Sequence, residues 1–247
     1  NLVGKVGVVR PTFEEYPNRL TEEQVTTFVP QSATFRYTAS DLMAFFGKNQ
    51  VDSLLLINPD NPSGNFIPKD DVLKLAQWCE DKGVRFILDE SFVDFSVNFS
   101  TNTFLDNALL EGFPHMCVIK SISKSYGVPG LRLGILCSAD TSLVARMKKQ
   151  VSIWNINSFA EFFMQIYPKY RDDYNRACCQ FIKARDDFEA ELTQIPFIKV
   201  MPSQANYFFL EVLAPYKPKQ LCSILLEKYN ILASACLAKK GIEPNKY

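Results

Sequence analysis

Residues 52–90 read DSLLLINPDNPSGNFIPKDDVLKLAQWCEDKGVRFILDE, and this stretch decides the fold class. The runs DSLLLIN at 52–58 and VRFILDE at 84–90 are apolar enough for strands covered on both faces. Between them, residues 69–83 have a helical period that ends at Gly83 and puts five apolar side chains on one face: Val72, Leu73, Leu75, Ala76 and Cys79. This strand–helix–strand order predicts a right-handed crossover in a mostly parallel sheet.

The same alternation continues along the first 140 residues. Further strands are expected at 5–10, 116–120 and 133–138. The sequence therefore predicts an α/β fold of three layers, with a mostly parallel sheet between helices.

Beyond residue 140 the pattern becomes helical, with an interruption at Pro168. The expected elements after it are strands at 198–201 and 206–212, a helix at 218–229 and a strand at 231–234. The chain is thus predicted to have a large α/β domain at 1–150, a connecting helical segment at 151–195 and a smaller C-terminal α+β domain at 196–247.

Composition restricts the class of protein. Hydrophobic residues make up 47% and charged residues 22%, which is typical of a globular protein. Lys+Arg and Asp+Glu both number 27, so bulk charge gives no reason to expect nucleic acid or a membrane as partner. Seven cysteines without a CxxC pair and no long apolar run favour a cytoplasmic protein. With His115 as the single histidine, in a predicted loop, no metal site is expected.

Polar clusters follow three of the predicted strands. They are NPDNPSG at 58–64, DES at 89–91 and SISK at 121–124. Ligands of doubly wound sheets bind beyond the carboxyl ends of the strands, so the three clusters are expected to converge on one site.

The residue types in these clusters describe one chemistry. Lys124 supplies an amine that can form an imine, and Asp89 supplies a carboxylate that can keep a pyridine nitrogen protonated. Ser121, Ser123 and Arg132 supply hydroxyl and guanidinium donors for a phosphate. Together these groups match the needs of pyridoxal phosphate.

NPDNPSG, DESFVDF and SISKSYGVPGLRLG, in this order and spacing, resemble the three central motifs of the fold-type I, class I/II aminotransferases. The PGLRLG ending is most similar to the branch of histidinol-phosphate aminotransferases and threonine-phosphate decarboxylases. The resemblance implies a seven-stranded mixed sheet, a homodimer and transfer of an amino group between an amino acid, or an amino phosphate ester, and an oxo acid. Decarboxylation of a phosphorylated amino acid, or a fragment that keeps only the fold, are the alternatives.

The resemblance also implies roles for single residues. Lys124 matches the lysine that holds the cofactor as a Schiff base and shuttles a proton, and Asp89 matches the partner of the pyridinium. Asn61 matches the donor to the phenolic oxygen, and Phe13, in PTF at 11–13, matches the ring stacked on the cofactor. Ser121, Ser123 and Arg132 fall where the family holds the phosphate.

Each of these residues also has a purely structural interpretation. Asp89 could cap a helix or end a strand in solvent, Phe13 could be a core aromatic, and Arg132 could pair with a surface acid. Trp154, in WNIN at 154–157, is expected to line the substrate entrance or to pack between the two domains.

The chain departs from the family pattern at two places. Phe92 stands where aspartate-aminotransferase-like members have a tyrosine whose hydroxyl donates to the phenolic oxygen. Loss of that donor is expected to raise the pKa of the bound cofactor. The family's N-terminal phosphate-binding turn and its C-terminal arginine for the substrate carboxylate are not found, so we expect a chain truncated at both ends.

Overall fold

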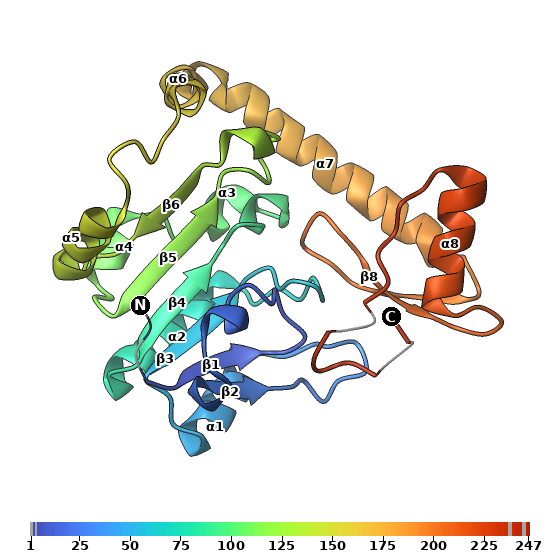
Figure 1. Ribbon diagram of the computed structural model, residues 1–247, viewed down its shortest axis with the longest axis horizontal. Helices are drawn as coiled ribbons and strands as arrows, with labels where there is room; N and C mark the ends of the chain where they lie inside the picture. The colour runs from blue at the N-terminus through green and yellow to red at the C-terminus, as the bar shows by residue number, and fades with distance from the viewer. Residues whose placement is uncertain (1, 3, 237–238, 244–245) are drawn as a thin grey trace.

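A six-stranded sheet forms the centre of the larger part of the molecule (Figure 1). The structure is a computed structural model that describes residues 2, 4–236, 239–243 and 246–247. In spatial order the strands are β2 (Val25–Phe28), β1 (Val6–Val9), β3 (Ser53–Ile57), β4 (Arg85–Asp89), β5 (Met116–Ser121) and β6 (Gly134–Cys137). Only the β5–β6 pair is antiparallel. The predicted α/β class with a mostly parallel sheet is confirmed, with six strands in the described residues instead of seven.

Three helices supply the apolar layer on one face of this sheet. They are α1 (Ala39–Lys48), α2 (Lys69–Lys82) and α4 (Asn107–Glu111). As predicted, α2 buries Val72, Leu75, Ala76 and Cys79 against the strands. It ends at Gly83, whose left-handed φ of 66° lets its amide bond to the carbonyls of Cys79 and Glu80.

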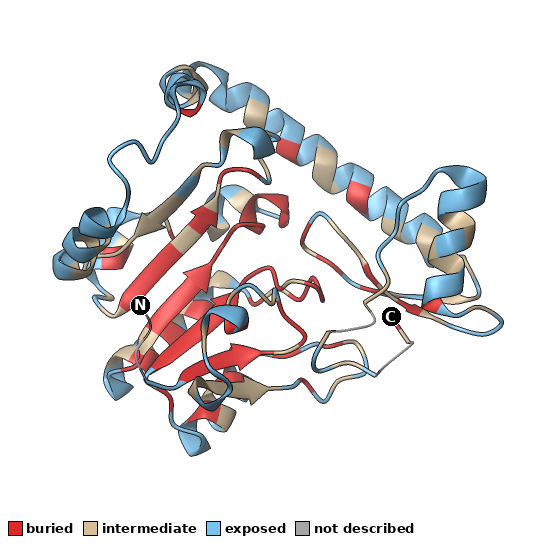
Figure 2. Cartoon of the chain, viewed as in Figure 1, coloured by how far each residue is buried: buried red, intermediate tan, exposed pale blue. Residues whose placement is uncertain are grey.

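The opposite face carries a smaller apolar cluster. Val6, Val8, Leu55 and Ile87 form its buried part. Leu2, Tyr16, Leu20, Val25 and Ile119 pack against it, so in the described residues this cluster is covered by strands and by the segment before β2. The strands β1, β3 and β4 are buried almost throughout, whereas most of α7 is exposed (Figure 2).

The C-terminal half is joined to the sheet by a long helix. The helical stretch is interrupted near Pro168 as predicted, because α6 ends at Ile166 and α7 begins at Arg171. Figure 1 shows α7 running from the edge of the large sheet to the small one. The elements of this half are α5 (Thr141–Gln150), α6 (Ser158–Ile166), α7 (Arg171–Leu192), β7 (Ile198–Met201), β8 (Phe209–Val212) and α8 (Pro218–Tyr229).

Two expected elements differ from the structure. The strand predicted at 231–234 is wrong: the segment has no strand partner, and Leu232 is 84% exposed. Conversely, β2 was not expected, since its sequence VTTF contains only two apolar residues. β2 forms because it pairs in parallel with all four residues of β1. The division into 1–150, 151–195 and 196–247 stays a prediction.

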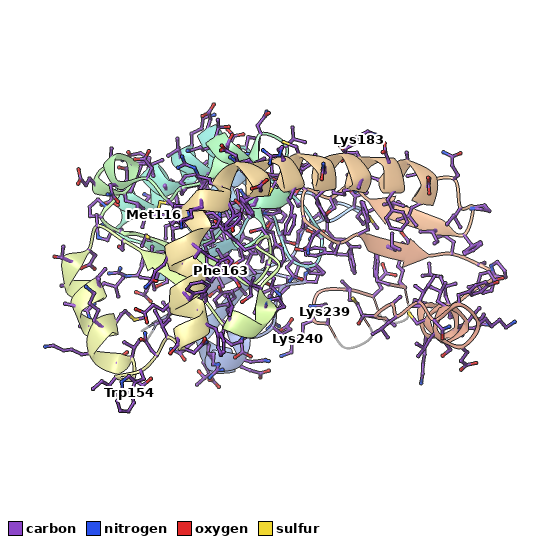
Figure 3. All side chains as sticks on the ribbon, turned by 90° about the horizontal axis from the view of Figure 1, so that it is seen from above. Met116, Trp154, Phe163, Lys183, Lys239 and Lys240 are labelled. Carbon is purple, nitrogen blue, oxygen red and sulfur yellow. The ribbon has the colours of Figure 1, made fainter. Side chains whose placement is uncertain are left out.

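The segment between α5 and α6 is strongly exposed. Trp154 points away from the ribbon in Figure 3 and is 88% exposed, so packing between the domains is wrong for it. Ile153 next to it is 86% exposed. Within the described residues, no helix combines the length and apolarity needed to cross a membrane.

Candidate active site

The ends of four neighbouring parallel strands bring the sequence motifs to one edge of the sheet. β1, β3, β4 and β5 are adjacent and run in the same direction, so the segments that follow them emerge together. Backbone bonds continue beyond the strands: the Asn58 amide donates to the Asp89 carbonyl at 2.9 Å, and the Glu90 amide to the Ile119 carbonyl at 2.9 Å. The predicted convergence of these three motifs follows from this order.

Asp89 is a buried acid with three donors. The Tyr16 hydroxyl donates to Oδ2 at 2.6 Å, while the Ser91 amide and hydroxyl donate to Oδ1 at 2.9 and 2.5 Å. Burial, and then the Asp89 charge, raise the pKa of Tyr16, so this phenol stays a donor. A carboxylate held in this way is not a solvated strand end.

Lys124 lies on the turn after β5, with its side chain exposed. Its amine stands 5.8 Å from the centroid of the Phe92 ring. Phe92 packs edge to face against Tyr207, at 5.1 Å between centroids. No carboxylate of the described residues forms an ion pair with Lys124, and the amine is therefore available to an incoming carbonyl compound.

The NPDNPSG loop contains a buried acid that the sequence did not single out. Asp60 is 2% exposed and accepts from the Tyr37 hydroxyl at 3.3 Å and from the Ser63 amide at 3.2 Å. Burial raises its pKa to about 6. Asn61, the predicted donor, is only partly buried beside it.

Tyr207 links this loop to Asp89. Its hydroxyl donates to the Asp60 carbonyl at 2.8 Å. Burial raises its pKa, with further contributions from the charges of Asp60 and Asp89, which places the phenol close to both acids. The sequence motifs did not include Tyr207, and its neighbour Asn206 has an exposed side chain. The signal was weak, because a tyrosine next to the strand Phe209–Val212 resembles any core aromatic.

The predicted phosphate donors lie at the last residue of β5 and on the turns that follow it. Ser123 is buried, and Ser121 is partly buried, with its amide donating to the Ser91 hydroxyl at 2.9 Å. Arg132 is exposed, has a left-handed φ of 55°, and donates from Nη1 to the Pro129 carbonyl at 3.0 Å. No ion pair to a surface acid is present for Arg132 within the described residues.

Phe13 lies at the end of β1, beside Tyr16. Its ring meets the Tyr16 ring edge to face at 6.0 Å and is 46% exposed. It is therefore not a core aromatic. Its neighbour Tyr16 in turn donates a hydrogen bond to the Asp89 carboxylate.

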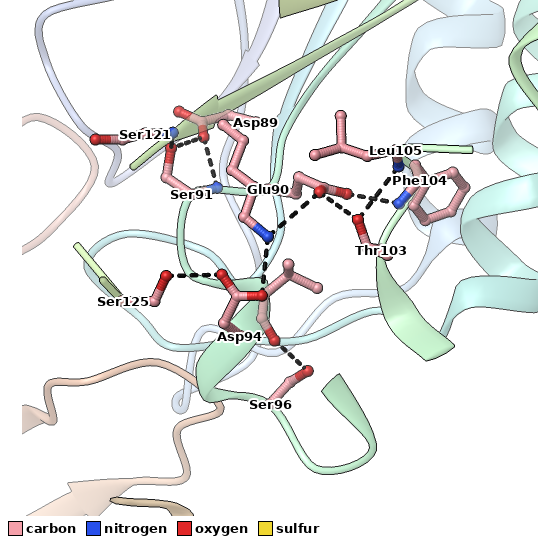
Figure 4. A network of polar contacts seen from close by, with 12 residues as sticks. Asp89, Glu90, Ser91, Asp94, Ser96, Thr103, Phe104, Leu105, Ser121 and Ser125 are labelled. Atoms are coloured by element: carbon pink, nitrogen blue, oxygen red, sulfur yellow. Dashed lines mark hydrogen bonds and ion pairs between the residues drawn. The ribbon is translucent and has the colours of Figure 1, made fainter. Parts of the chain in front are cut away.

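A buried ionic network next to this edge was missed by the sequence analysis (Figure 4). Lys120 is 4% exposed, and its amine lies 2.8 Å from Asp94 Oδ1 and 3.8 Å from Glu90 Oε1. Asp94 also accepts from the Ser125 hydroxyl at 2.7 Å. Burial raises the pKa of Glu90 even though Lys120 opposes the shift. The position of Lys120 at the end of an apolar run does not predict that its amine is buried or that it pairs with Asp94.

The donor set at the sheet edge fits pyridoxal phosphate. A buried, hydrogen-bonded carboxylate faces the edge from β4, and an unpaired amine and two serines follow the adjacent β5. Two cavities of about 390 and 500 Å³ lie elsewhere, beside Tyr37 and Phe45 and beside Lys5 and Trp78. They contain none of the residues predicted for the cofactor.

Comparison with known proteins places the chain in a family. The model of the family "Aminotransferase class I and II" matches residues 4–240. CMP-5'-(3-aminopropyl)phosphonate synthase of Streptomyces rubellomurinus is 33% identical over 240 residues, which are 96% of this chain and 37% of that protein. An L-serine phosphate decarboxylase of Campylobacter jejuni is 30% identical over 250 residues, with 98% of this chain and 63% of that protein covered.

Solved structures show the same architecture. A decarboxylase from Sulfurospirillum multivorans superposes with a TM-score of 0.87 at 28% identity, covering 98% of this chain and 69% of the other. The histidinol-phosphate aminotransferase from Clostridium acetobutylicum, at 24% identity, gives a TM-score of 0.85 and covers 98% and 71%, and it supports the fold alone.

The chain corresponds to only part of each of these two relatives. It spans between about a third and two thirds of the two relatives' own lengths, 37% and 63%. The family match covers nearly all of the chain, and the fold is that of the pyridoxal-phosphate-dependent transferases. The chain belongs to the class I and II aminotransferase family, in the branch of the histidinol-phosphate aminotransferases and threonine-phosphate decarboxylases.

Proposed function

We propose that this chain forms the cofactor-binding part of a pyridoxal-phosphate-dependent enzyme that transfers an amino group between an amino acid, or an amino phosphate ester, and an oxo acid. One observation carries the proposal: the exposed Lys124 amine, which has no ionic partner among the described residues, lies beyond β5, next to the strand that ends in the buried Asp89. When bound, the cofactor supplies the electron sink that weakens the bonds to the substrate's α-carbon.

Each residue at this edge of the sheet has a separate proposed role. Lys124 is the covalent attachment point and carries a proton to and from the α-carbon. Asp89, fixed by Tyr16 and Ser91, stabilises a proton on the pyridine nitrogen. Ser121, Ser123 and Arg132 bind the phosphate, Asn61 donates to the phenolic oxygen, and Phe13 covers one face of the ring.

Decarboxylation of a phosphorylated amino acid is the second candidate. It is favoured by the relative that covers 98% of this chain and is named an L-serine phosphate decarboxylase. The same groups serve both reactions. Which one occurs depends on whether the bond to hydrogen or the bond to the carboxylate is held perpendicular to the pyridine ring, and that choice belongs to residues that bind the substrate.

Chemical trapping tests the cofactor assignment. With pyridoxal phosphate added, the protein should gain an absorption band that borohydride abolishes, and peptide mass spectrometry should find the reduced cofactor on Lys124 alone. Lys183 on α7 (Figure 3) is a suitable internal control, because its side chain is 77% exposed and it belongs to none of the three motifs. Equal labelling of both lysines would mean that Lys124 has no special site.

Product analysis with the complete protein separates the two reactions. A panel of amino donors, including phosphoserine and phosphothreonine, should yield an oxo acid with each accepted donor if transfer is the reaction. Release of carbon dioxide without an oxo acid would establish decarboxylation instead.

We also propose that the complete protein is a homodimer. The support is a run of exposed apolar side chains around α6, namely Ile153, Trp154, Ile156, Phe159 and Phe162, because such patches mark contact surfaces. Light scattering after size exclusion should give twice the subunit mass. A monomer at micromolar concentration would contradict this.

A further inference from the structure

Two lysines only four residues apart frame the turn that carries the proposed chemistry. Lys120 ends in a buried ion pair, whereas Lys124 ends in an exposed amine. The backbone at the start of the turn is tied down, because the Ser121 amide donates to the Ser91 hydroxyl at 2.9 Å and the Ile122 amide to the Leu133 carbonyl at 3.1 Å. The Gly127 amide closes the turn onto the Lys124 carbonyl at 3.1 Å. Among the described residues, the backbone amides of residues 123–126 have no hydrogen-bond acceptor, so side-chain contacts are needed to hold this part of the turn.

Asp94 contacts the chain on both sides of Lys124. Its Oδ1 accepts from the Lys120 amine at 2.8 Å, and its Oδ2 accepts from the Ser125 hydroxyl at 2.7 Å. Figure 4 shows the two carboxylate oxygens pointing to these different partners. The Asp94 side chain therefore binds Lys120, just before the SISK motif, and Ser125, just after it.

The same short turn supplies the surface under the amine. Asp94 lies in the 3₁₀ turn Val93–Phe95, which directly follows Phe92, the ring beneath the Lys124 amine. This turn is itself fixed, because the Phe95 amide donates to the Phe92 carbonyl at 3.1 Å and buried Arg185 of α7 donates to the Phe95 carbonyl. The segment Phe92–Phe95 therefore contacts both the Lys124 amine, through the Phe92 ring, and the Lys124 turn, through Asp94.

Aromatic rings pack near Asp94, which is itself only 6% exposed. Tyr126 stacks on Tyr174 of α7 at 4.4 Å between centroids and 16° between planes. Burial, and then the charge of Asp94, raise the pKa of Tyr174, so this ring lies close to the Asp94 carboxylate. A hydrogen bond to a charged oxygen is stronger when it is shielded in this way.

We infer that Asp94 is a positioning residue for Lys124: through its paired bonds to Lys120 and Ser125 it holds the Lys124 turn in the geometry that presents the amine to the cofactor. The inference rests on the proposed role of Lys124. It concerns an acid with no place among the cofactor-binding residues. Asp94 acts through Lys120, Ser125 and the turn, so it differs from Asp89, which is proposed to face the cofactor itself.

The decisive variant is Ser125→Ala in the full chain, without cofactor. It removes the tie to Asp94 and leaves the Lys120 ion pair intact. The matched control is Ser96→Ala, which deletes a buried hydroxyl at the other end of the same 3₁₀ turn, where it donates to the Val93 carbonyl at 2.6 Å. Ser125→Thr keeps the hydroxyl and is the rescue variant.

Hydrogen exchange of the Gly127 amide reports the turn directly. In Ser125→Ala it should exchange roughly five- to tenfold faster than in the parent, Ser96→Ala and Ser125→Thr, while the urea midpoints of Ser125→Ala and Ser96→Ala agree. Reductive methylation should show a changed reactivity of the Lys124 amine in Ser125→Ala alone. Unchanged exchange and reactivity in Ser125→Ala would overturn the inference, and so would changes matched by Ser96→Ala.

A second measurement separates this inference from the proposed function. In cofactor-loaded protein, borohydride should fix pyridoxal phosphate to Lys124 several-fold more slowly in Ser125→Ala, with the rate restored in Ser125→Thr. If the parent takes up no cofactor, the proposed function fails, but the cofactor-free exchange comparison still decides whether Asp94 positions the turn.

Discussion

Lys120 and Lys124 have the same side chain and lie on the same strand and its following turn, yet they have opposite environments. Lys120 is 4% exposed and is paired with Asp94, with Glu90 slightly farther away. Lys124 is exposed and contacts only a ring face among the described residues. The comparison indicates that the Lys120 amine neutralises buried carboxylates, whereas the Lys124 amine is accessible to a reactant.

The largest expected effect is on the free amine. Lys124→Ala should eliminate turnover and borohydride fixation, because it removes the amine that is proposed to form the imine, and should change the free energy of unfolding by less than about 0.5 kcal/mol, as is usual for exposed positions. Mass spectrometry after reduction and urea titration measure the two quantities. Persistent fixation on a neighbouring lysine would break the comparison.

The reverse result is expected for the paired amine. Lys120→Met should lower the free energy of unfolding by about 3–5 kcal/mol, because two carboxylates would stay buried without a cation. Urea unfolding measures the loss. Combining it with Glu90→Gln and Asp94→Asn should recover a substantial part of the stability. If the single variant were as stable as the parent, the network would not be structural.

Asp60 is a buried acid like Asp94, but its direct partners are hydroxyls and a backbone amide instead of a lysine. Its pKa is raised from 3.8 to about 6 in the folded state, so the native protein binds this proton more tightly than the unfolded chain does. The resulting stability is present below pH 3.8 and is lost as the pH rises through about 6, a change of up to roughly 3 kcal/mol.

The measurement is urea unfolding of the parent and Asp60→Asn across this pH window. The difference in free energy between the two should shift in favour of Asp60→Asn as the pH rises, whatever its value at low pH. Parallel pH profiles would show that Asp60 ionises freely in the native state.

The smallest expected effect concerns Asp89, the acid that is proposed to face the cofactor. Tyr16→Phe removes one of three donors to Asp89 and should weaken pyridoxal phosphate binding by about 1–2 kcal/mol, or roughly five- to thirtyfold. A fluorescence titration measures the affinity. Tyr170→Phe, at a 56% exposed tyrosine, is the control and should bind normally. Equal affinities in both would mean that Ser91 alone orients Asp89.

Much of the fold could be predicted because its signals are local. Apolar runs bounded by turns predicted β1, β3, β4, β5 and β6, and the 3.6-residue period predicted α2 and its end at Gly83. β2 and the segment at 231–234 could not be predicted correctly, because strand formation there depends on a pairing partner: the polar VTTF has one in β1 and the apolar ILAS has none.

The sequence by itself determined the chemical inventory and its order: an acid, an amide and an amine after successive strands. It singled out Lys124 by its motif, but it could not show that Lys120 is buried in an ion pair, nor reveal that Asp60, Tyr207 and Asp94 lie beside that inventory, because their partners are up to 147 residues away along the chain. Only the tertiary structure decided which ionisable groups lost their water and which kept it. Burial depends on the whole set of neighbours, and it decides whether a charge stabilises the fold or is free to react.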